Sequence, residues 1–140
     1  MKRRVLFDTC VIVDVLFKRE PHSTESTKTF DMAIQGKIDG FISAHSITTL
    51  DYLLTKEFDQ ATSKNLIEEL LNYFLVAPVT GKIIKQALSS KINDFEDAVS
   101  HSAGLSENVS VIITRNIKDF SKGELQAVLP EVFNSDVIKR

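Results

Sequence analysis

Three short apolar runs in the sequence each end in a polar residue, and this feature constrains the fold more than any other. Asp8, Ser43 and Thr114 each follow directly after a run rich in Val, Ile, Leu or Phe. Continuous apolar runs of this kind are typical of strands buried on both faces, as in parallel sheets. The carboxyl ends of parallel strands lie at one edge of the sheet, where open α/β folds bind their ligands. We therefore expect these polar residues to meet at one edge of a buried sheet.

Strand and helix patterns alternate along the chain. The apolar run before Asp8 continues after it, Pro78 favours an edge position for its strand, and Gly104 is expected to end a helix. The predicted strands cover residues 5–13, 40–43, 75–79 and 109–114, the predicted helices cover residues 23–34, 48–58, 59–74, 81–88 and 94–103, and an apolar run at 125–129 precedes a short polar tail. This order predicts a single domain over residues 1–140 that forms a three-layer α/β/α sandwich with a central, mainly parallel sheet.

Composition narrows the class of protein. Hydrophobic residues make up 43% and charged residues 26% of the chain, which is typical of a globular protein rather than a disordered one. The lone Cys10 predicts a buried, reduced thiol, and with no export signal or membrane span we expect a cytoplasmic protein. The net charge of −2 gives no general attraction to nucleic acid, so such binding requires a local basic patch.

Acidic residues lie in three separate segments that this topology would bring together. Asp8 follows the first strand, Asp94 and Asp97 stand three apart on one face at a helix start, and Asp119 follows the last buried strand. Each has an ordinary alternative, since Asp is common at turns and Asp94 is a natural helix N-cap, and Glu96 is expected on another face in solvent. Their convergence favours a binding site instead. Clustered carboxylates repel one another, and Mg²⁺ or Mn²⁺ prefers such oxygen ligands.

The chain resembles the PIN domain, a class of metal-dependent nucleases that includes the VapC-type toxins. The similarity lies in three blocks, at residues 7–12 (FDTCVI), 94–98 (DFEDA) and 113–120 (ITRNIKDF). It implies a parallel sheet with flanking helices and an acidic pocket with Mg²⁺ or Mn²⁺. The implied site has Asp8, Asp94 and Asp97 as metal-binding catalytic residues, Asp119 as a further acidic residue, and Thr9, Thr114 and Asn116 as supporting pocket residues.

Two positions depart from the family pattern. Most active members carry an acid on the helix after the second strand, and that position is Thr49 here. Asp51 lies two residues further on, roughly 200° around the helix, and cannot simply replace it. Cys10 stands where the family often has a small polar residue such as Asn. A related subgroup shares the reduced acid set, so loss of activity does not follow from these departures.

The resemblance implies metal-dependent hydrolysis of RNA, by the toxin of a toxin–antitoxin pair. The cations nearest to the site segments are Arg115 and Lys118, followed by Lys18, Arg19 and Lys122. The implied partners are RNA, a small antitoxin and a second copy of the chain in a homodimer.

Other classes of function fit less well. A PIN fold with a depleted site could bind RNA or a protein without cutting, and Thr49 is the residue that favours this alternative. A haloacid-dehalogenase-like phosphatase needs a second Asp where Cys10 stands, and no Gly-rich phosphate-binding loop is present. We expect ordinary structural roles for His22, His45 and His101.

Overall fold

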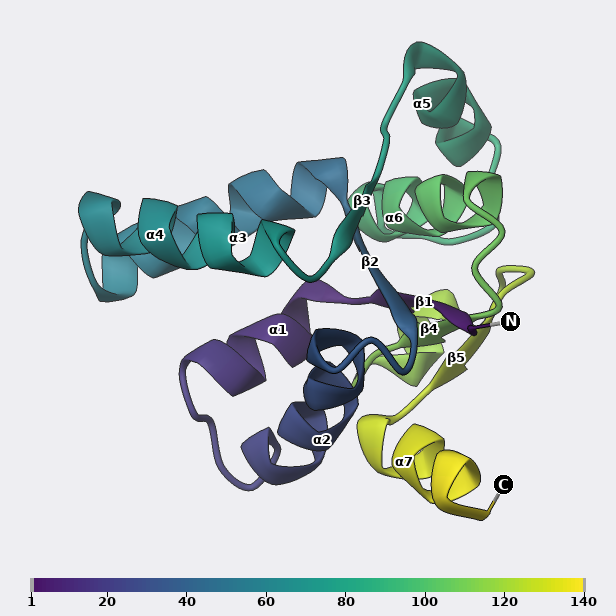
Figure 1. The fold of residues 1–140 in the computed structure, drawn as a ribbon. Coiled ribbons are helices and arrows are strands. Elements are labelled where there is room, and N and C mark those ends of the chain that lie inside the picture. The colour runs from purple at the N-terminus through teal and green to yellow at the C-terminus, as the bar shows by residue number, and fades with distance from the viewer. Residues whose placement is uncertain (1, 140) are drawn as a thin grey trace.

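A five-stranded, all-parallel sheet forms the centre of the protein (Figure 1). The computed structural model describes residues 2–139. The strands are β1 (Arg4–Phe7), β2 (Asp39–Ser43), β3 (Leu75–Ala77), β4 (Val111–Ile113) and β5 (Gln126–Val128), arranged in the order β3-β2-β1-β4-β5. The predicted α/β fold is confirmed. The strand before Pro78 lies at the edge of the sheet, as its proline requires, because proline cannot donate a ladder hydrogen bond.

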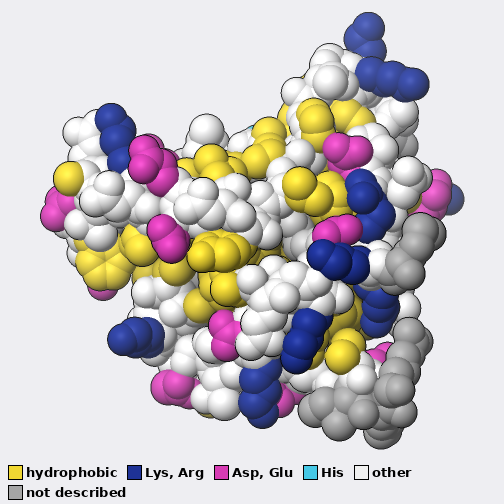
Figure 2. Space-filling view, in the orientation of Figure 1, with side chains coloured by type: hydrophobic (Ala, Val, Ile, Leu, Met, Phe, Trp, Pro, Cys, Tyr) yellow, Lys and Arg dark blue, Asp and Glu magenta, His cyan; other side chains and the backbone are white. Residues whose placement is uncertain are grey.

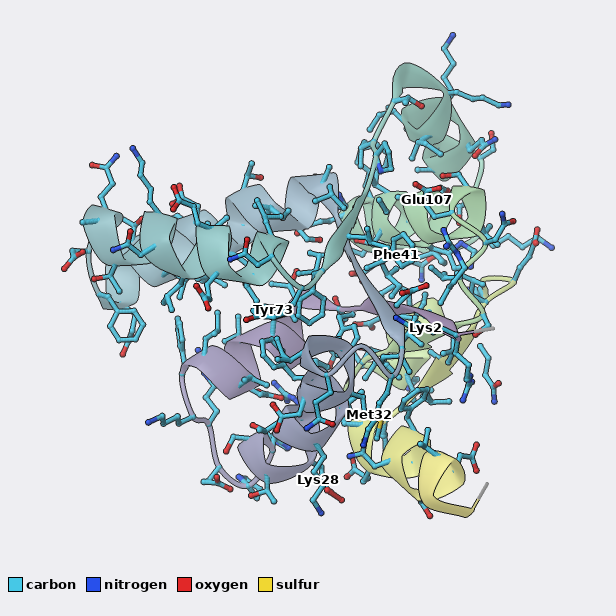
Figure 3. The ribbon with its side chains drawn as sticks, in the orientation of Figure 1. Lys2, Lys28, Met32, Phe41, Tyr73 and Glu107 are labelled. Atoms are coloured by element: carbon cyan, nitrogen blue, oxygen red, sulfur yellow. The ribbon has the colours of Figure 1, made fainter. Side chains whose placement is uncertain are left out.

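Side chains of the strands alternate between two apolar cores, one on each face of the sheet. In β1, Val5 and Phe7 face one core while Leu6 faces the other. Figure 3 labels one residue of each core: Met32 on α2 packs against the first core, and Phe41 on β2 belongs to the second. The first core is covered by α1 (Thr9–Leu16), α2 (Ser23–Ile34), α3 (Ala44–Glu57), α4 (Gln60–Leu71) and α7 (Pro130–Lys139), and the second by α5 (Gly81–Leu88), α6 (Phe95–Ser106) and the short 3-10 helix η1 (Ile117–Phe120). The layers are therefore helix, sheet and helix.

The predicted helical hairpin at residues 48–74 is present as α3 and α4. It extends away from the sheet (Figure 1), and Asp59 begins α4 by accepting a hydrogen bond from the Thr62 N–H at 2.7 Å. No helix in residues 2–139 combines the length and apolar character that a bilayer crossing needs.

The predicted continuation of the first strand through residues 11–13 is wrong, because these residues lie in α1. Asp8 ends β1, and its side chain accepts the N–H of Thr9 at the start of the helix. Val11, Ile12 and Val13 are all buried. A short helix that is apolar on most sides cannot be distinguished from a buried strand by hydrophobic periodicity.

The sequence predicted that Gly104 would end its helix. This prediction is wrong, because α6 continues to Ser106. A Cβ atom at Gly104 would lie 3.0 Å from Val109 Cγ2 and 3.1 Å from Leu6 Cδ2. The glycine therefore allows α6 to approach the sheet closely.

The residues predicted as a short polar tail form the helix α7. Pro130 occupies the first position of the helix, where the missing N–H costs nothing. Phe133 is buried in the first core, and Asn134 Nδ2 donates to the Glu25 carbonyl on α2 at 2.9 Å. The apolar run before the tail forms β5.

Candidate metal centre at the carboxyl edge of the sheet

Asp8 lies at the carboxyl end of β1, the central strand of the sheet. Its N–H donates to the Ile113 carbonyl on β4 at 2.9 Å, which fixes the backbone at this edge. One carboxylate oxygen, Oδ1, accepts the Thr9 N–H at 2.9 Å, and Oδ2 accepts the Thr114 hydroxyl at 2.7 Å. Burial raises the pKa of Asp8 above its usual value, although these hydrogen bonds act in the opposite direction. The carboxylate is thus held rigidly in a partly desolvated position.

Thr114 and Cys10 complete the hydrogen bonding around Asp8. The buried Thr114 hydroxyl also accepts the Asn116 N–H at 2.9 Å, which joins Asp8 to the turn after β4. The Cys10 thiol lies 3.4 Å from Asp8 Oδ2. Burial, reinforced by the charge of Asp8, raises the pKa of this thiol to about 12, so it remains protonated and donates. Cys10 therefore serves as a weak donor to the acid beside it.

Asp97 lies in the first turn of α6 and is half-buried. Its pKa is raised to about 7, first by burial and then by the charges of Asp8, Asp94, Asp119 and Glu96, in that order. Four other carboxylates consequently lie within electrostatic range of this one side chain. The acids that are separated in the sequence meet at one edge of the sheet.

Asp94 combines the two roles that the sequence left open. Its Oδ1 accepts the Asp97 N–H at 3.0 Å, which makes it the N-cap of α6. Its charge also raises the pKa of Asp97. The cap uses one carboxylate oxygen and orients the acid at the helix terminus, next to Asp97.

Asp119 enters the site from η1, the short helix after β4. Its N–H donates to the Asn116 carbonyl at 3.0 Å, and its charge raises the pKa of both Asp8 and Asp97. Both Asn116 and Asp119 are exposed. They lie on the solvent side of this acidic edge, whereas Thr114 is buried.

The donor set fits a hard divalent cation. The ion pairs among the described residues join Lys28 to Glu25 and Arg115 to Asp14, so no protein cation neutralises the clustered site acids. No three His, Cys, Asp or Glu side chains within residues 2–139 are close enough to enclose one ion together. Carboxylate oxygens are the ligands that Mg²⁺ and Mn²⁺ prefer, and Mg²⁺ also keeps several of its waters. The pocket therefore offers suitable ligands without a closed cage.

Arg115 has a structural partner that the sequence did not reveal. Its Nε and Nη2 bind the two carboxylate oxygens of the fully buried Asp14, at 2.7 and 3.0 Å, and Ser26 donates to the same carboxylate at 3.1 Å. Such a two-point ion pair fixes the turn after β4 to α1. The predicted RNA contact at Arg115 would require a guanidinium already engaged with Asp14, whereas Lys118 is exposed. Asp14 directly follows the apolar run mistaken for a strand, and a lone acid between Val13 and Val15 was the available signal.

Glu96 is exposed, as the sequence predicted, but its carboxylate has a protein partner. Its Oε1 accepts the Thr49 hydroxyl on α3 at 3.2 Å. Asp51, by contrast, accepts the Ser63 hydroxyl at 2.6 Å and so faces α4. The structure thus agrees that Asp51 cannot replace an acid at position 49, and it brings Glu96 to that position instead.

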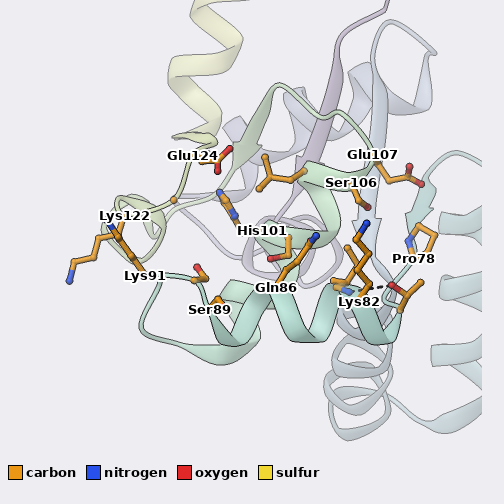
Figure 4. Close-up of a pocket in the computed structure, with 16 residues that line it drawn as sticks. Pro78, Lys82, Gln86, Ser89, Lys91, His101, Ser106, Glu107, Lys122 and Glu124 are labelled. Carbon is orange, nitrogen blue, oxygen red and sulfur yellow. Dashed lines mark hydrogen bonds between the residues drawn. The ribbon is translucent and has the colours of Figure 1, made fainter.

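A cavity of about 1010 Å³ lies at the other end of α6, away from the acidic edge (Figure 4). It is bounded by α5, the second half of α6 and the loop before β5, with Lys82, Lys91 and Lys122 on its walls. His101 Nε2 accepts the Leu125 N–H at 3.1 Å, and burial lowers the pKa of this histidine. His101 is thus a neutral core residue that holds the loop before β5.

The fold and the acidic edge define an α/β protein with a carboxylate-rich site at the ends of parallel strands. A family model described as PIN domain matches residues 4–118, and the chain belongs to this family.

Individual relatives share this similarity over most of their length. Ribonuclease VapC1 of Aquifex aeolicus is 24% identical over 135 residues, which cover 93% of this chain and 92% of the relative. The solved structure of VapBC2 from Rickettsia felis, bound to a promoter DNA fragment, contains a chain with a TM-score of 0.71 and 16% identity, covering 90% of this chain and 98% of its own. VapC20 of Mycobacterium tuberculosis, described as a sarcin–ricin loop cleaving toxin, has a TM-score of 0.67 and 13% identity, covering 85% and 95% respectively.

Proposed function

We propose that this protein is a divalent-metal-dependent endoribonuclease and the toxin of a toxin–antitoxin pair. The observation that carries the proposal is the convergence of Asp8, Asp97 and Asp119 at one edge of the sheet, where the charge of each neighbour raises the pKa of Asp97. Membership of the PIN domain family and the similarity to ribonuclease VapC1 support RNA as the substrate.

The side chains suggest how the site would work. Asp8 and Asp97 would hold Mg²⁺ or Mn²⁺ with several of its waters still in place, and the uncapped oxygen of Asp94 would lie beside the ion rather than close a three-acid cage. When bound, such an ion lowers the pKa of water and stabilises the negative charge that develops on phosphate. Thr114 and Cys10 keep the Asp8 carboxylate in one orientation through their hydrogen bonds. No protein nucleophile is required for this hydrolysis.

The exposed side of the pocket is where RNA would approach. Asp119 adds a carboxylate there, and the neighbouring Lys118 is exposed and offers a positive charge for a backbone phosphate. Asn116 lies in the same turn and can bond a phosphate oxygen through its amide. Arg115 would act indirectly, because its ion pair with Asp14 fixes this turn.

The second candidate function is a PIN module that binds RNA or a protein without cutting. Thr49, which stands where most active members carry an acid, is the observation that favours it. Under the main proposal the chain belongs to an active subgroup with this reduced acid set.

A small antitoxin and a second copy of the chain are the proposed protein partners. Solved relatives are described as toxin–antitoxin complexes, including one from Klebsiella pneumoniae with a TM-score of 0.67. An RNA substrate and an antitoxin both favour action in the cytoplasm.

The test is cleavage of structured and single-stranded RNAs by purified protein with Mg²⁺, Mn²⁺ or EDTA. We expect metal-dependent cutting that is lost in Asp8→Asn and Asp97→Asn. Asp31→Asn is the matched control, because Asp31 is exposed on α2. If wild type and all variants leave every RNA intact in each metal, the nuclease proposal fails and the binding module becomes the better account.

A further inference from the structure

The cavity beside the second half of α6 has walls from three separate parts of the chain (Figure 4). Helix α5 and the residues after it form one wall, α6 forms the second, and the loop at residues 122–124 forms the third. A Cβ atom at Gly123 would lie 2.5 Å from His101 Nε2, so this loop packs directly against α6. The volume of about 1010 Å³ lies at the upper end of the range for small-molecule sites.

Two side chains on the α6 wall are almost fully buried and each has a donor without an acceptor. His101 and Ser102 are both 4% exposed, and both line the cavity. Because His101 Nε2 accepts the Leu125 N–H, the imidazole proton lies on Nδ1. Neither this N–H nor the Ser102 hydroxyl makes a hydrogen bond within residues 2–139. The described side-chain atoms that are both sealed from solvent and unpartnered are Arg3 Nη1 and Glu25 Oε2, so the two donors on α6 are open to the cavity.

Three lysines surround these donors. Lys82 lies at the start of α5, Lys91 lies after its end, and Lys122 lies on the loop before β5. All three are exposed, and the ion pairs found within residues 2–139 involve other side chains. Each wall therefore offers hydrogen-bond donors, and two of the three walls carry positive charges without an acidic partner. Such a set of donors suits a phosphate group, whose oxygens only accept.

Two acids limit how large the anionic ligand can be. Glu107 and Glu124 also line the cavity, and Figure 4 shows them well apart. A strand of many phosphates that continued past both acids would be repelled, whereas a molecule with a single phosphate group can avoid them. His101 adds no charge, because burial lowers its pKa and keeps it neutral. The cavity thus favours a small anion over a long polyanion.

We propose that this cavity is a second ligand site, for a small molecule with a phosphate group such as a mononucleotide. The lysines would attract the phosphate, and Ser102 and His101 Nδ1 would donate to its oxygens or to polar groups on the rest of the molecule. The site is separate from the acidic edge of the sheet and requires no metal. The proposal therefore does not depend on the nuclease function.

The test is an NMR titration of the isotope-labelled protein in EDTA, first with inorganic phosphate and then with adenosine 5′-monophosphate. We expect saturable shifts of the backbone amides of His101, Ser102 and Gly123, with none at Asp8. The mononucleotide should bind more tightly than phosphate, because the cavity has room for the rest of the molecule.

Variants test whether the lining side chains make the site. Lys91→Met combined with Lys122→Met should raise the dissociation constant of the mononucleotide about tenfold or more, and Ser102→Ala should raise it about threefold. Lys64→Met is the matched control, because Lys64 is exposed on α4, and it should bind as wild type does.

Several outcomes would overturn the proposal. These are the absence of saturable shifts at the cavity amides with both probes, wild-type affinity in the double lysine variant, and an equal loss in Lys64→Met. A short single-stranded RNA that shifts these amides when the mononucleotide does not would show that the occupant is an RNA strand instead. Because no metal is present, none of these outcomes decides whether the acidic edge cuts RNA.

Discussion

At the scale of single residues, the site depends on carboxylates held in positions that disfavour their charge. Asp8 and Asp97 both have raised pKa values, and burial is the largest cause for each. Hydrogen bonds from Thr9, Thr114 and Cys10 only partly offset burial at Asp8. A rigid scaffold thus keeps the acids together, at a cost in stability that a bound cation would offset.

The raised pKa of Asp97 predicts how the stability of the metal-free protein changes with pH. Its pKa rises from 3.8 when unfolded to about 7 when folded, so between these values the folded state holds a proton that the unfolded state has released. The free energy of unfolding should therefore fall as pH rises from 4 to 7. Because the side chain is partly exposed, we expect only about 1–2 kcal/mol from this group. Urea unfolding in EDTA at several pH values measures the fall.

Asp97→Asn provides the comparison for this pH dependence. Asn cannot titrate, so the variant should lose less stability than wild type over the same pH range. The fall in the free energy of unfolding with pH that remains in this variant is expected to come partly from Asp8, whose pKa is raised as well. Identical slopes in the two proteins would show that Asp97 does not titrate in this range.

The Thr114 hydroxyl is expected to stabilise the fold through its bond to Asp8. Thr114→Val keeps the shape of the side chain but removes a buried donor to a carboxylate and the acceptor of the Asn116 N–H. Losing a hydrogen bond to a charged group costs about 2 kcal/mol, and we expect a loss of that size in urea unfolding at pH 8. Thr114→Ser retains the hydroxyl and should lose clearly less. Equal losses would attribute the effect to packing.

At the scale of elements, the sequence predicted what hydrophobic periodicity can resolve. The helices at residues 23–34 and 81–88 have the predicted bounds, and the helical hairpin and the strands after the first lie within a few residues of the predicted positions. Residues 11–13 were predicted as a strand because a helix that is buried on most sides lacks the polar face that marks a helix in the sequence. Gly104 was predicted to end its helix because the sequence does not distinguish a glycine that ends a helix from one that allows close packing. The mostly polar sequence of α7 gave no sign that Phe133 would be buried in the core.

The candidate site could be predicted only as far as it depends on where strands end and helices begin. Strand ends and helix starts can be located in the sequence, so the convergence of Asp8, Asp97 and Asp119 could be predicted. The pairing of Glu96 with Thr49 joins side chains 47 positions apart, and that of Arg115 with Asp14 joins side chains 101 apart. Neither pairing can be predicted from the local sequence pattern. The first depends on how α3 and α6 pack, and the second on how the turn after β4 packs against α1.

The ion pair between Arg115 and Asp14 is expected to fix the turn after β4 to α1. Arg115→Met would leave the Asp14 carboxylate buried without its cation, which costs about 3 kcal/mol or more in unfolding experiments. Adding Asp14→Asn should recover part of this loss, since the unpaired charge is removed. Lys118→Met, at the exposed residue three positions away, should change stability by less than about 0.5 kcal/mol. A similar small effect in Arg115→Met would contradict the anchoring role.

At the scale of the whole molecule, the protein has no overall charge field that would attract RNA. The net charge is −2, and on the face shown in Figure 2 acidic and basic side chains are intermixed. Apolar side chains also show on this face around the α3–α4 hairpin and β3 (Figure 2), and Tyr73 and Leu75 are exposed apolar residues of this part of the chain. RNA recognition would then rely on local contacts such as Lys118, and its dependence on salt should be shallow.

Metal binding should stabilise the whole fold, because the clustered acids repel one another in the metal-free protein. A ligand that binds only the folded state at 100 times its dissociation constant raises the free energy of unfolding by about 2.7 kcal/mol. For a chain of this size that corresponds to a rise in Tm of roughly 6–10 °C with Mn²⁺ relative to EDTA. Asp8→Asn should abolish the rise, whereas Asp31→Asn on the exposed face of α2 should retain it. The same rise in Asp8→Asn would place the ion away from the carboxyl edge of the sheet, and no rise in wild type would contradict a metal pocket in this protein.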